Sequence, residues 1–140
     1  MDDLDFVIET IEPWVDKYNT QGASALSDNE VIGVGVWLLE TEVNNGGFDQ
    51  YYFNSSGNLA VVTVDALKRI GAIETAALLE AANAGVPSLP LPEDRDERSE
   101  ILDQVSEVSR FNALESEYYQ ERENRISLLA KYLRKIPDGT

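Results

Sequence analysis

Residues 27–57 decide the fold, and they read SDNEVIGVGVWLLETEVNNGGFDQYYFNSSG. Ser27 and Glu30 have the S-x-x-E spacing of a capping box, a pair of side chains that closes the first turn of a helix. Residues 31–39 then carry no charge and no side-chain amide. The β-branched residues in this run also suit a strand, but the preceding cap and the uninterrupted continuation through residues 38–42 favour a helix. Because this helix is apolar on every side, we expect it to be the buried centre of the fold.

Two glycines lie inside this predicted helix. Gly33 and Gly35 each cost about 1 kcal/mol relative to alanine in a helix interior. We therefore expect neighbouring helices to approach the central helix closely at these positions.

The central helix runs into a polar segment with two adjacent glycines. Gly46 or Gly47 is expected to adopt the left-handed conformation that closes a helix. Phe48, Tyr51 and Tyr52 follow with i, i+3, i+4 spacing, so we expect them to share one face of a further helical segment.

Polar side chains are concentrated in the same segment. Such groups beside a buried helix need hydrogen-bond partners, since each unsatisfied one costs about 1–3 kcal/mol. We interpret them as a network that fixes the junction between two helical segments. The alternative is a carboxylate-based catalytic or small-ligand site. The side chains concerned are Glu42, Asn44, Asn45, Asp49 and Gln50.

The run EVNNGGFDQYYFNSSG at residues 42–57, with Trp37 to Leu39 before it, resembles the signature of the bacterial DNA-mimic protein family. The resemblance covers about residues 5–135. It implies an all-helical fold. It also implies a possible role, because at least one member of the family occupies the DNA-binding face of a helix-turn-helix repressor. The residues of this structural signature are Trp37, Glu42, Asn44, Asn45, Gly46, Gly47, Phe48, Gln50, Tyr51, Phe53, Asn54 and Gly57.

The composition excludes several kinds of chemistry. The 140 residues, enough for one domain spanning 1–140, include no cysteine and no histidine. Disulfides, thiol nucleophiles, zinc thiolates and the commonest general base are therefore absent, and we expect no cofactor and no metal. The acidic N-terminus is unlike a signal peptide, and no apolar run reaches the roughly 18 residues of a membrane span. We expect a cytoplasmic protein.

Charge is the most informative property of the composition. Twenty-six acids against 11 bases give a net charge of −15, of which residues 1–67 carry −11. Such a chain should repel nucleic acid and anionic membranes and attract a basic protein. The alternative is that the acids serve solubility alone.

Two rows of acids occur at helical spacing. With a rise of 1.5 Å per residue, the charges of the first row lie roughly 5 Å apart along the axis. This density is comparable to that of phosphates on one DNA strand, which rise about 3.4 Å each. We predict that both rows bind a partner, and the alternative is a pair of solvated outer faces. The first row is Asp2, Asp5, Glu9, Glu12 and Asp16, and the second is Glu93, Glu97 and Glu100, interrupted by Arg95 and Arg98.

The fold class predicted from these patterns is all-α, a single-domain bundle of about six to eight helices around a buried central helix. In the first helix, Leu4, Ile8, Ile11, Val15 and Tyr18 form the expected core stripe, and Pro13 either kinks that helix or begins a second one. Tyr118 and Tyr119 are expected to anchor a short helix, capped by Asn112, against the central helix. Besides the central helix, the predicted helices are Asp3–Tyr18, Asn58–Ile70, Ile73–Ala84, Glu93–Val108, Asn112–Gln120 and Asn124–Ile136, with an extended connector over Val86–Pro92.

These features predict a non-enzymatic protein, a monomer or homodimer, that binds neither nucleic acid nor membrane directly. Its acidic rows would engage a basic protein such as a helix-turn-helix transcription regulator, in competition with DNA. Two alternatives remain. One is an immunity-type or accessory protein that neutralises another basic protein, and the other is a carboxylate-based enzyme or ligand site at Glu42–Gln50.

Overall fold

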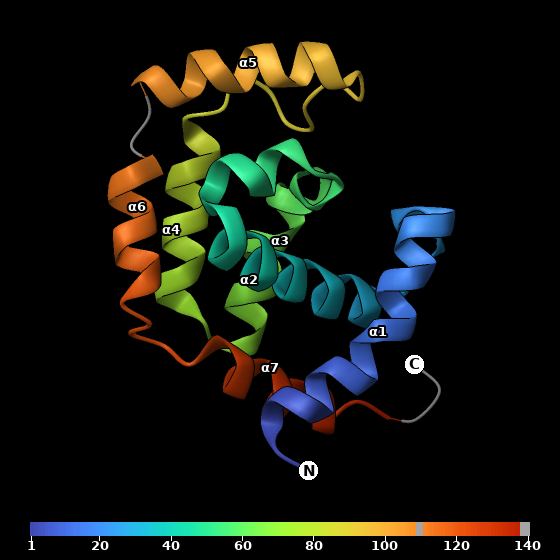
Figure 1. The fold of residues 1–140 in the computed structure, drawn as a ribbon. Coiled ribbons are helices and arrows are strands. Elements are labelled where there is room, and N and C mark those ends of the chain that lie inside the picture. Colours follow the sequence, from blue (N-terminus) through green and yellow to red (C-terminus); the bar gives the residue numbers. More distant parts are fainter. Residues whose placement is uncertain (109–110, 138–140) are drawn as a thin grey trace.

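Helix α2 crosses the middle of the molecule and the other helices pack around it (Figure 1). The structure is a computed structural model, and it describes residues 1–108 and 111–137. All regular elements within these residues are helices, so the predicted all-α class is confirmed. The α-helices are α1 (Asp3–Gln21), α2 (Asp28–Phe53), α3 (Ala60–Ile70), α4 (Ile73–Ala84), α5 (Arg95–Val108), α6 (Phe111–Tyr119) and α7 (Arg125–Arg134), and the short 3-10 helices are η1 (Ala23–Ala25) and η2 (Ser55–Leu59).

The capping box at the start of α2 is formed as predicted. The Glu30 amide donates to Ser27 Oγ at 3.2 Å, and the Ser27 amide donates to Glu30 Oε1 at 2.8 Å. The apolar run that follows is buried, with Val34 and Leu39 fully inaccessible. The cap therefore starts the helix, and burial on several sides keeps it at the centre.

The two glycines of α2 are the points where neighbouring helices come closest. A Cβ atom on Gly33 would lie 2.8 Å from the Trp14 ring of α1, and one on Gly35 would lie 2.5 Å from Thr63 Oγ1 of α3. Both distances are shorter than a van der Waals contact. The predicted close approaches are confirmed, with α1 at one glycine and α3 at the other.

Gly35→Ala should lower the free energy of unfolding by about 1–3 kcal/mol, because overpacking outweighs the gain in helix propensity. Denaturant unfolding measures the effect of Gly35→Ala in the wild type and in Thr63→Ala. Because Thr63→Ala lacks the hydroxyl that a Cβ on residue 35 would meet, the same change should be neutral or stabilising there. An equal loss of stability in both backgrounds would contradict the close approach.

Gly46 and Gly47 bend α2 into two segments. Gly47 has φ +76°, but its ψ of −172° is not that of the left-handed helical conformation predicted to close the helix at this pair, so the prediction is met in φ and not in ψ. Near the start of the second segment, the Phe48 amide donates to Glu115 Oε1 of α6 at 2.8 Å. Phe48, Tyr51 and Tyr52 are fully buried on one face, as their spacing predicted.

Helix α1 runs through Pro13 without a break, so no second helix begins there. Its predicted core stripe is partly wrong. Leu4 is 48% exposed and Ile8 is 39% exposed, while Val7 is fully buried with Ile11. Because α1 packs against both α2 and α7, its buried face centres on the Val7–Ile11 side, and Leu4 and Ile8 fall at the edge of that face.

The remaining helices follow the predicted order. Gly71, with φ +91°, ends α3 in the left-handed conformation, and α4 has the predicted bounds. The connector over residues 86–92 contains no helix, and α5 packs across the second segment of α2 (Figure 1). Asn112 does not cap α6, because the helix already includes Phe111. The predicted helix Glu93–Val108 begins two residues later than expected, at Arg95, and the side chain of Val108 lies outside the described residues.

Candidate functional site

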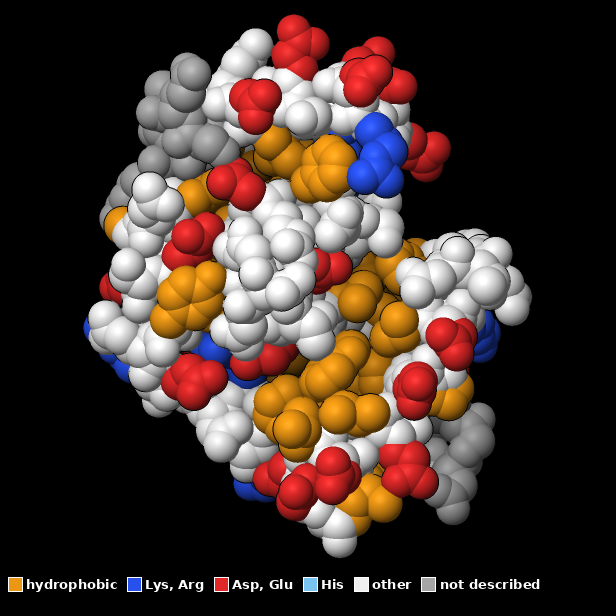
Figure 2. Space-filling model, viewed as in Figure 1, with side chains coloured by type: hydrophobic (Ala, Val, Ile, Leu, Met, Phe, Trp, Pro, Cys, Tyr) orange, Lys and Arg blue, Asp and Glu red, His pale blue; other side chains and the backbone are white. Residues whose placement is uncertain are grey.

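The acidic row of α1 lies on the outer surface of the molecule (Figure 2). Asp2 caps the helix, since its Oδ1 accepts the Asp5 amide at 2.8 Å. The other four acids fall within about 60° of the helix circumference at 100° per residue. All five side chains are exposed, and none forms an ion pair with a residue that the structure describes; they are Asp2, Asp5, Glu9, Glu12 and Asp16.

Contacts on the inner side hold α1 in place at both ends. Near its start, Arg134 of α7 bonds Asp3 at 2.6 Å, and this bond holds the pKa of the Asp3 carboxyl below its ordinary value. Near its end, the Tyr18 hydroxyl donates to the Ser55 carbonyl at 2.7 Å. Lys17, the one base in residues 1–67, lies 3.1 Å from Glu30 of α2 and so does not neutralise the row. The four outer acids are therefore presented by an anchored helix.

The Glu30 carboxylate couples this anchoring to pH. Burial acts to raise its pKa, but hydrogen bonds from the Ser27 amide and the Lys17 ammonium outweigh burial, and the net pKa is lowered. Because the unfolded value is about 4.3, the resulting stabilisation is fully present above that pH. It is lost as the pH falls through the lowered pKa of the folded state.

Glu30→Gln should remove this pH dependence while keeping a side chain that can cap the helix. The stability advantage of the wild type over Glu30→Gln is expected to shrink between about pH 6 and pH 3. Urea unfolding across that range measures the difference. A difference that stays constant or grows in acid would show that Glu30 does not act in this way.

The second acidic row lies along α5 and its approach, with Glu93, Glu97 and Glu100 exposed. The two arginines that interrupt this row in the sequence face other groups. Arg98 is buried and donates to the Tyr52 carbonyl at 2.8 Å and the Asn54 carbonyl at 3.0 Å. The Arg95 guanidinium lies over the Phe53 ring at 4.9 Å.

The two rows lie on different edges of the molecule, since α5 crosses one end and α1 flanks the side (Figure 1). They approach each other at Glu93, which shares a pocket of about 320 Å³ with Tyr18 and Asn19 of α1. The structure thus brings Glu93 near the end of α1 but does not merge the rows into one continuous line.

The polar signature segment is tied together by Glu42. Its carboxylate accepts Gln50 Nε2 at 2.5 Å and Asn54 Nδ2 at 3.3 Å, which joins the two segments of α2 to the residue that follows them. Asn44 Nδ2 donates to Glu40 Oε1 at 2.9 Å. A Cβ on Gly57 would lie 2.8 Å from the Tyr52 Cα, so only glycine fits that turn. Asn45 and Asp49 are exposed and Trp37 is partly buried.

A pocket of about 440 Å³ opens beside this network. Glu42 and Asn54, which line it, already bond each other, and Arg98 is held by backbone carbonyls. The pocket is therefore bordered by groups whose positions are fixed by the fold.

A buried ion pair that the sequence interpretation missed connects α2, α6 and α7. Arg125 Nε lies 2.5 Å from Glu40 Oε2, and the Tyr118 hydroxyl donates to the same oxygen at 2.6 Å. The Arg125 guanidinium also lies 3.6 Å above the Tyr118 ring. Burial raises the pKa of Tyr118 well above its ordinary value, and the Glu40 charge adds to this rise. The predicted anchoring is confirmed, since Tyr119 also donates to the Val43 carbonyl at 2.7 Å.

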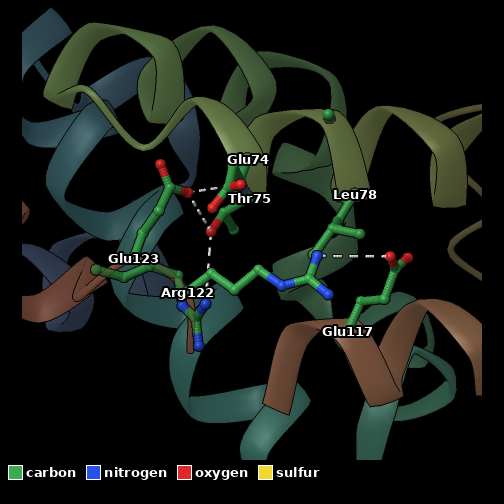
Figure 3. Close-up of a pocket in the computed structure, with 8 residues that line it drawn as sticks. Glu74, Thr75, Leu78, Glu117, Arg122 and Glu123 are labelled. Carbon is green, nitrogen blue, oxygen red and sulfur yellow. Dashed lines mark hydrogen bonds and ion pairs between the residues drawn. The ribbon is translucent and has the colours of Figure 1, made fainter. Parts of the chain in front are cut away.

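A pocket of about 210 Å³ between α4 and α6 is also lined by charged groups that bond to one another or to the backbone of the fold (Figure 3). Helix α4 begins without a side-chain cap of its own, and Glu123 supplies one by accepting the Thr75 amide at 2.7 Å and its hydroxyl at 3.0 Å. Arg122 reaches across to Glu117 at 3.7 Å. The charged groups here join helices to one another.

The described part of the chain contains neither a metal-binding cluster of side chains nor a helix that could span a membrane. Within residues 1–108 and 111–137, no group of three or more acidic side chains is placed to hold a metal ion. In the same part of the chain, no helix combines the length and apolar character needed to cross a bilayer.

Comparison with known proteins identifies a family. Residues 24–136 match the family described as DMP19-like protein, and this range includes the whole signature segment. The acidic row of α1 precedes the matched residues, so the match carries no information about it. No curated protein and no solved structure matches the chain significantly. On the strength of the family match, the chain belongs to the DMP19-like protein family.

Proposed function

We propose that this protein is a non-enzymatic binding protein whose acidic rows engage the basic DNA-binding face of another protein, such as a helix-turn-helix regulator, and so compete with DNA. The observation that carries the proposal is the row on α1, where four exposed carboxylates without ion pairs among the described residues lie along an anchored helix. DNA-binding proteins neutralise several phosphates with lysine and arginine. A fixed row of carboxylates offers those lysine and arginine side chains negatively charged oxygen atoms in place of the phosphate oxygens.

The arrangement of the bases supports this proposal. Lys17 pairs with Glu30, Arg98 faces backbone carbonyls, and Arg134 pairs with Asp3 at the start of α1. None of these bases lies between the four outer acids of α1 and solvent. These three bases therefore do not cancel the negative electrostatic field of the α1 row, and that field can attract a basic partner.

The chemistry available elsewhere supports a binding role rather than catalysis. The chain has no histidine and no cysteine, and the carboxylates of the signature and of the buried pair are engaged in hydrogen bonds within the fold. We propose on this basis that Glu42 serves the fold and not a reaction.

Affinity capture from the native host tests the proposal. The immobilised protein is expected to retain a basic protein, identified by mass spectrometry, whose retention falls steeply as NaCl is raised from low to high concentration. An acidic helical protein of equal net charge on the same resin is the control for non-specific ion exchange. Retention that is unchanged between low and high salt would refute the proposal. Capture of a basic protein that does not bind DNA would favour the immunity-type alternative.

A further inference from the structure

An exposed apolar strip runs beside the acidic row of α1. Leu4 and Ile8 are 48% and 39% exposed, and Val15 continues their line along the helix with part of its surface accessible. At 100° per residue, these three side chains lie next to the sector that holds Asp5 and Glu12. One flank of α1 is therefore apolar and the adjoining flank is negative.

Helix α2 provides the second wall of this apolar surface. Helix α1 packs against α2 at Gly33, where an added Cβ atom would lie 2.8 Å from the Trp14 ring, and Trp37 follows one turn later in α2. Trp37 is only partly buried. Figure 2 shows the result, a recessed apolar area between α1 and α2 with acidic side chains along its α1 edge. We name this area the α1–α2 groove, and the exposed strip of Leu4, Ile8 and Val15 is its α1 wall.

The charges around the groove restrict which kinds of molecule can bind in it. A second copy of this chain seated on the same face would bring two rows of carboxylates together, and like charges across an interface oppose association. Nucleic acid and anionic membranes are repelled for the same reason. A segment with an apolar stripe and a basic flank satisfies both parts of the surface, the apolar side chains at the centre and the charges at the rim.

The dimensions fit a helix. The strip from Leu4 to Val15 extends for about 16 Å at 1.5 Å per residue, which is about three turns of an opposing helix. Helices that bind in grooves present apolar side chains at i, i+3, i+4 and i+7, a span of about 10 Å that fits within the length of the strip.

We propose that the α1–α2 groove binds a basic amphipathic helix of the partner protein. The apolar side chains of that helix pack on Leu4, Ile8 and Trp37. Its lysine or arginine side chains pair with Asp5, Glu9 and Glu12. This inference rests on the proposed function for the basic character of the partner, and it adds where the partner binds and which element it uses.

Binding of a synthetic helical peptide tests this inference. The probe is a 14-residue peptide without tryptophan, with leucine at i, i+3, i+4 and i+7 and lysine and arginine on one flank. The reference peptide has the same composition in an order that gives no apolar face. The chain has two tryptophans, Trp14 and Trp37, and because Trp37 is only partly buried on α2, a change in tryptophan emission reports binding beside it.

The amphipathic peptide is expected to bind at least tenfold more tightly than the scrambled peptide and to shift the tryptophan emission to shorter wavelength. The double variant Leu4→Ser/Ile8→Ser should weaken its binding at least tenfold. The matched control Val61→Ser/Ile73→Ser changes residues that are 61% and 58% exposed on α3 and α4, and it should leave binding unchanged. Circular dichroism of both variants checks that the fold is intact.

Equal binding of the two peptides would overturn the inference that the groove binds an amphipathic helix, because charge alone would then explain the affinity. The proposed function would be unaffected by that result. Absence of binding by both peptides would also overturn the inference. The proposed function would still be tested separately, by the salt-sensitive capture of a basic protein. Sedimentation equilibrium that shows a wild-type dimer and a Leu4→Ser/Ile8→Ser monomer would assign the groove to a second copy of the chain and overturn the inference.

Discussion

Glu40→Ala is expected to lower the free energy of unfolding by about 3–5 kcal/mol, because it leaves Arg125 buried without its counter-charge. Arg125 is almost inaccessible to solvent, and it lies 2.5 Å from Glu40 and 3.6 Å above the Tyr118 ring. The same substitution removes the acceptor of the Tyr118 hydroxyl. Thermal and urea unfolding, followed by circular dichroism, measure the loss, and for a chain of this length the melting temperature should fall by about 10 °C.

Two controls separate the ion pair from a general effect of the substitution. Glu80→Ala changes an exposed glutamate of α4 and should alter stability by no more than about 0.5 kcal/mol. Tyr118→Phe removes one hydrogen bond to Glu40 and should cost about 1 kcal/mol. If Glu40→Ala unfolded at the same urea concentration as Glu80→Ala, the ion pair would not stabilise the fold.

A double variant tests the coupling between the two charges. Replacing Glu40 and Arg125 together with uncharged side chains of similar volume, Glu40→Gln and Arg125→Met, should cost less than the sum of the two single changes. The excess of that sum over the measured cost is the interaction energy of the pair. Additive losses would show that Glu40 and Arg125 stabilise the fold independently.

Reversal of the α1 row is expected to have the largest effect on partner binding. The triple variant Asp5→Lys, Glu9→Lys and Glu12→Lys places positive charge where the partner presents lysine and arginine, and such like-charge contacts cost several kcal/mol. The dissociation constant should therefore rise at least about a hundredfold, because about 1.4 kcal/mol corresponds to a factor of ten. Isothermal titration calorimetry with the captured partner measures the change.

The control for this variant has the same net charge. Asp65→Lys, Glu74→Lys and Glu80→Lys reverse three exposed acids of α3 and α4, away from α1. This variant should bind the partner with only a modest loss, because it changes the long-range field but not the contacts. Equal losses for the two variants would mean that total charge matters and the arrangement of the row does not.

Neither triple variant should unfold the domain. The α1 acids are exposed, and among the residues that the structure describes, no hydrogen bond from another helix to Asp5, Glu9 or Glu12 is formed. The inner contacts of α1, through Val7 and Ile11, are unchanged. Far-ultraviolet circular dichroism and the melting temperature of each variant establish this before binding is compared.

Local patterns predicted the parts of the fold that depend on neighbouring residues in the chain. The capping box at Ser27 and the shared face of Phe48, Tyr51 and Tyr52 are each decided within a few residues. The close approaches at Gly33 and Gly35 were also predictable, because a helix interior keeps glycine at a cost unless a neighbour needs the space.

Contacts between distant residues could not be predicted in this way. Glu40 and Arg125 are separated by 85 residues, and an arginine in an acidic protein is usually exposed. Arg98 interrupts an acidic row in the sequence, yet in the fold it points inward to the end of α2. Glu40 directly follows the apolar run of residues 31–39 on the predicted central helix, and this position was the one signal that a buried partner existed.

The edge of the buried face of α1 was unpredictable for a related reason. Helical periodicity identifies an apolar side, but the helices that pack there decide how wide the covered part is. With α2 and α7 as neighbours, Val7 is covered while Leu4 and Ile8 remain exposed. The acidic rows were recognisable from spacing alone, since exposure of charged side chains is their ordinary state.

The most direct measurement of the central claim is competition with DNA. Fluorescence anisotropy follows a labelled operator fragment bound to the captured regulator while this protein is added at constant ionic strength. The account predicts that the wild type releases the DNA, and that the Asp5→Lys, Glu9→Lys and Glu12→Lys variant requires at least about a hundredfold more protein to do so. Stable binding of the wild type to a regulator that keeps its DNA, or equal release by the wild type and the variant, would contradict it.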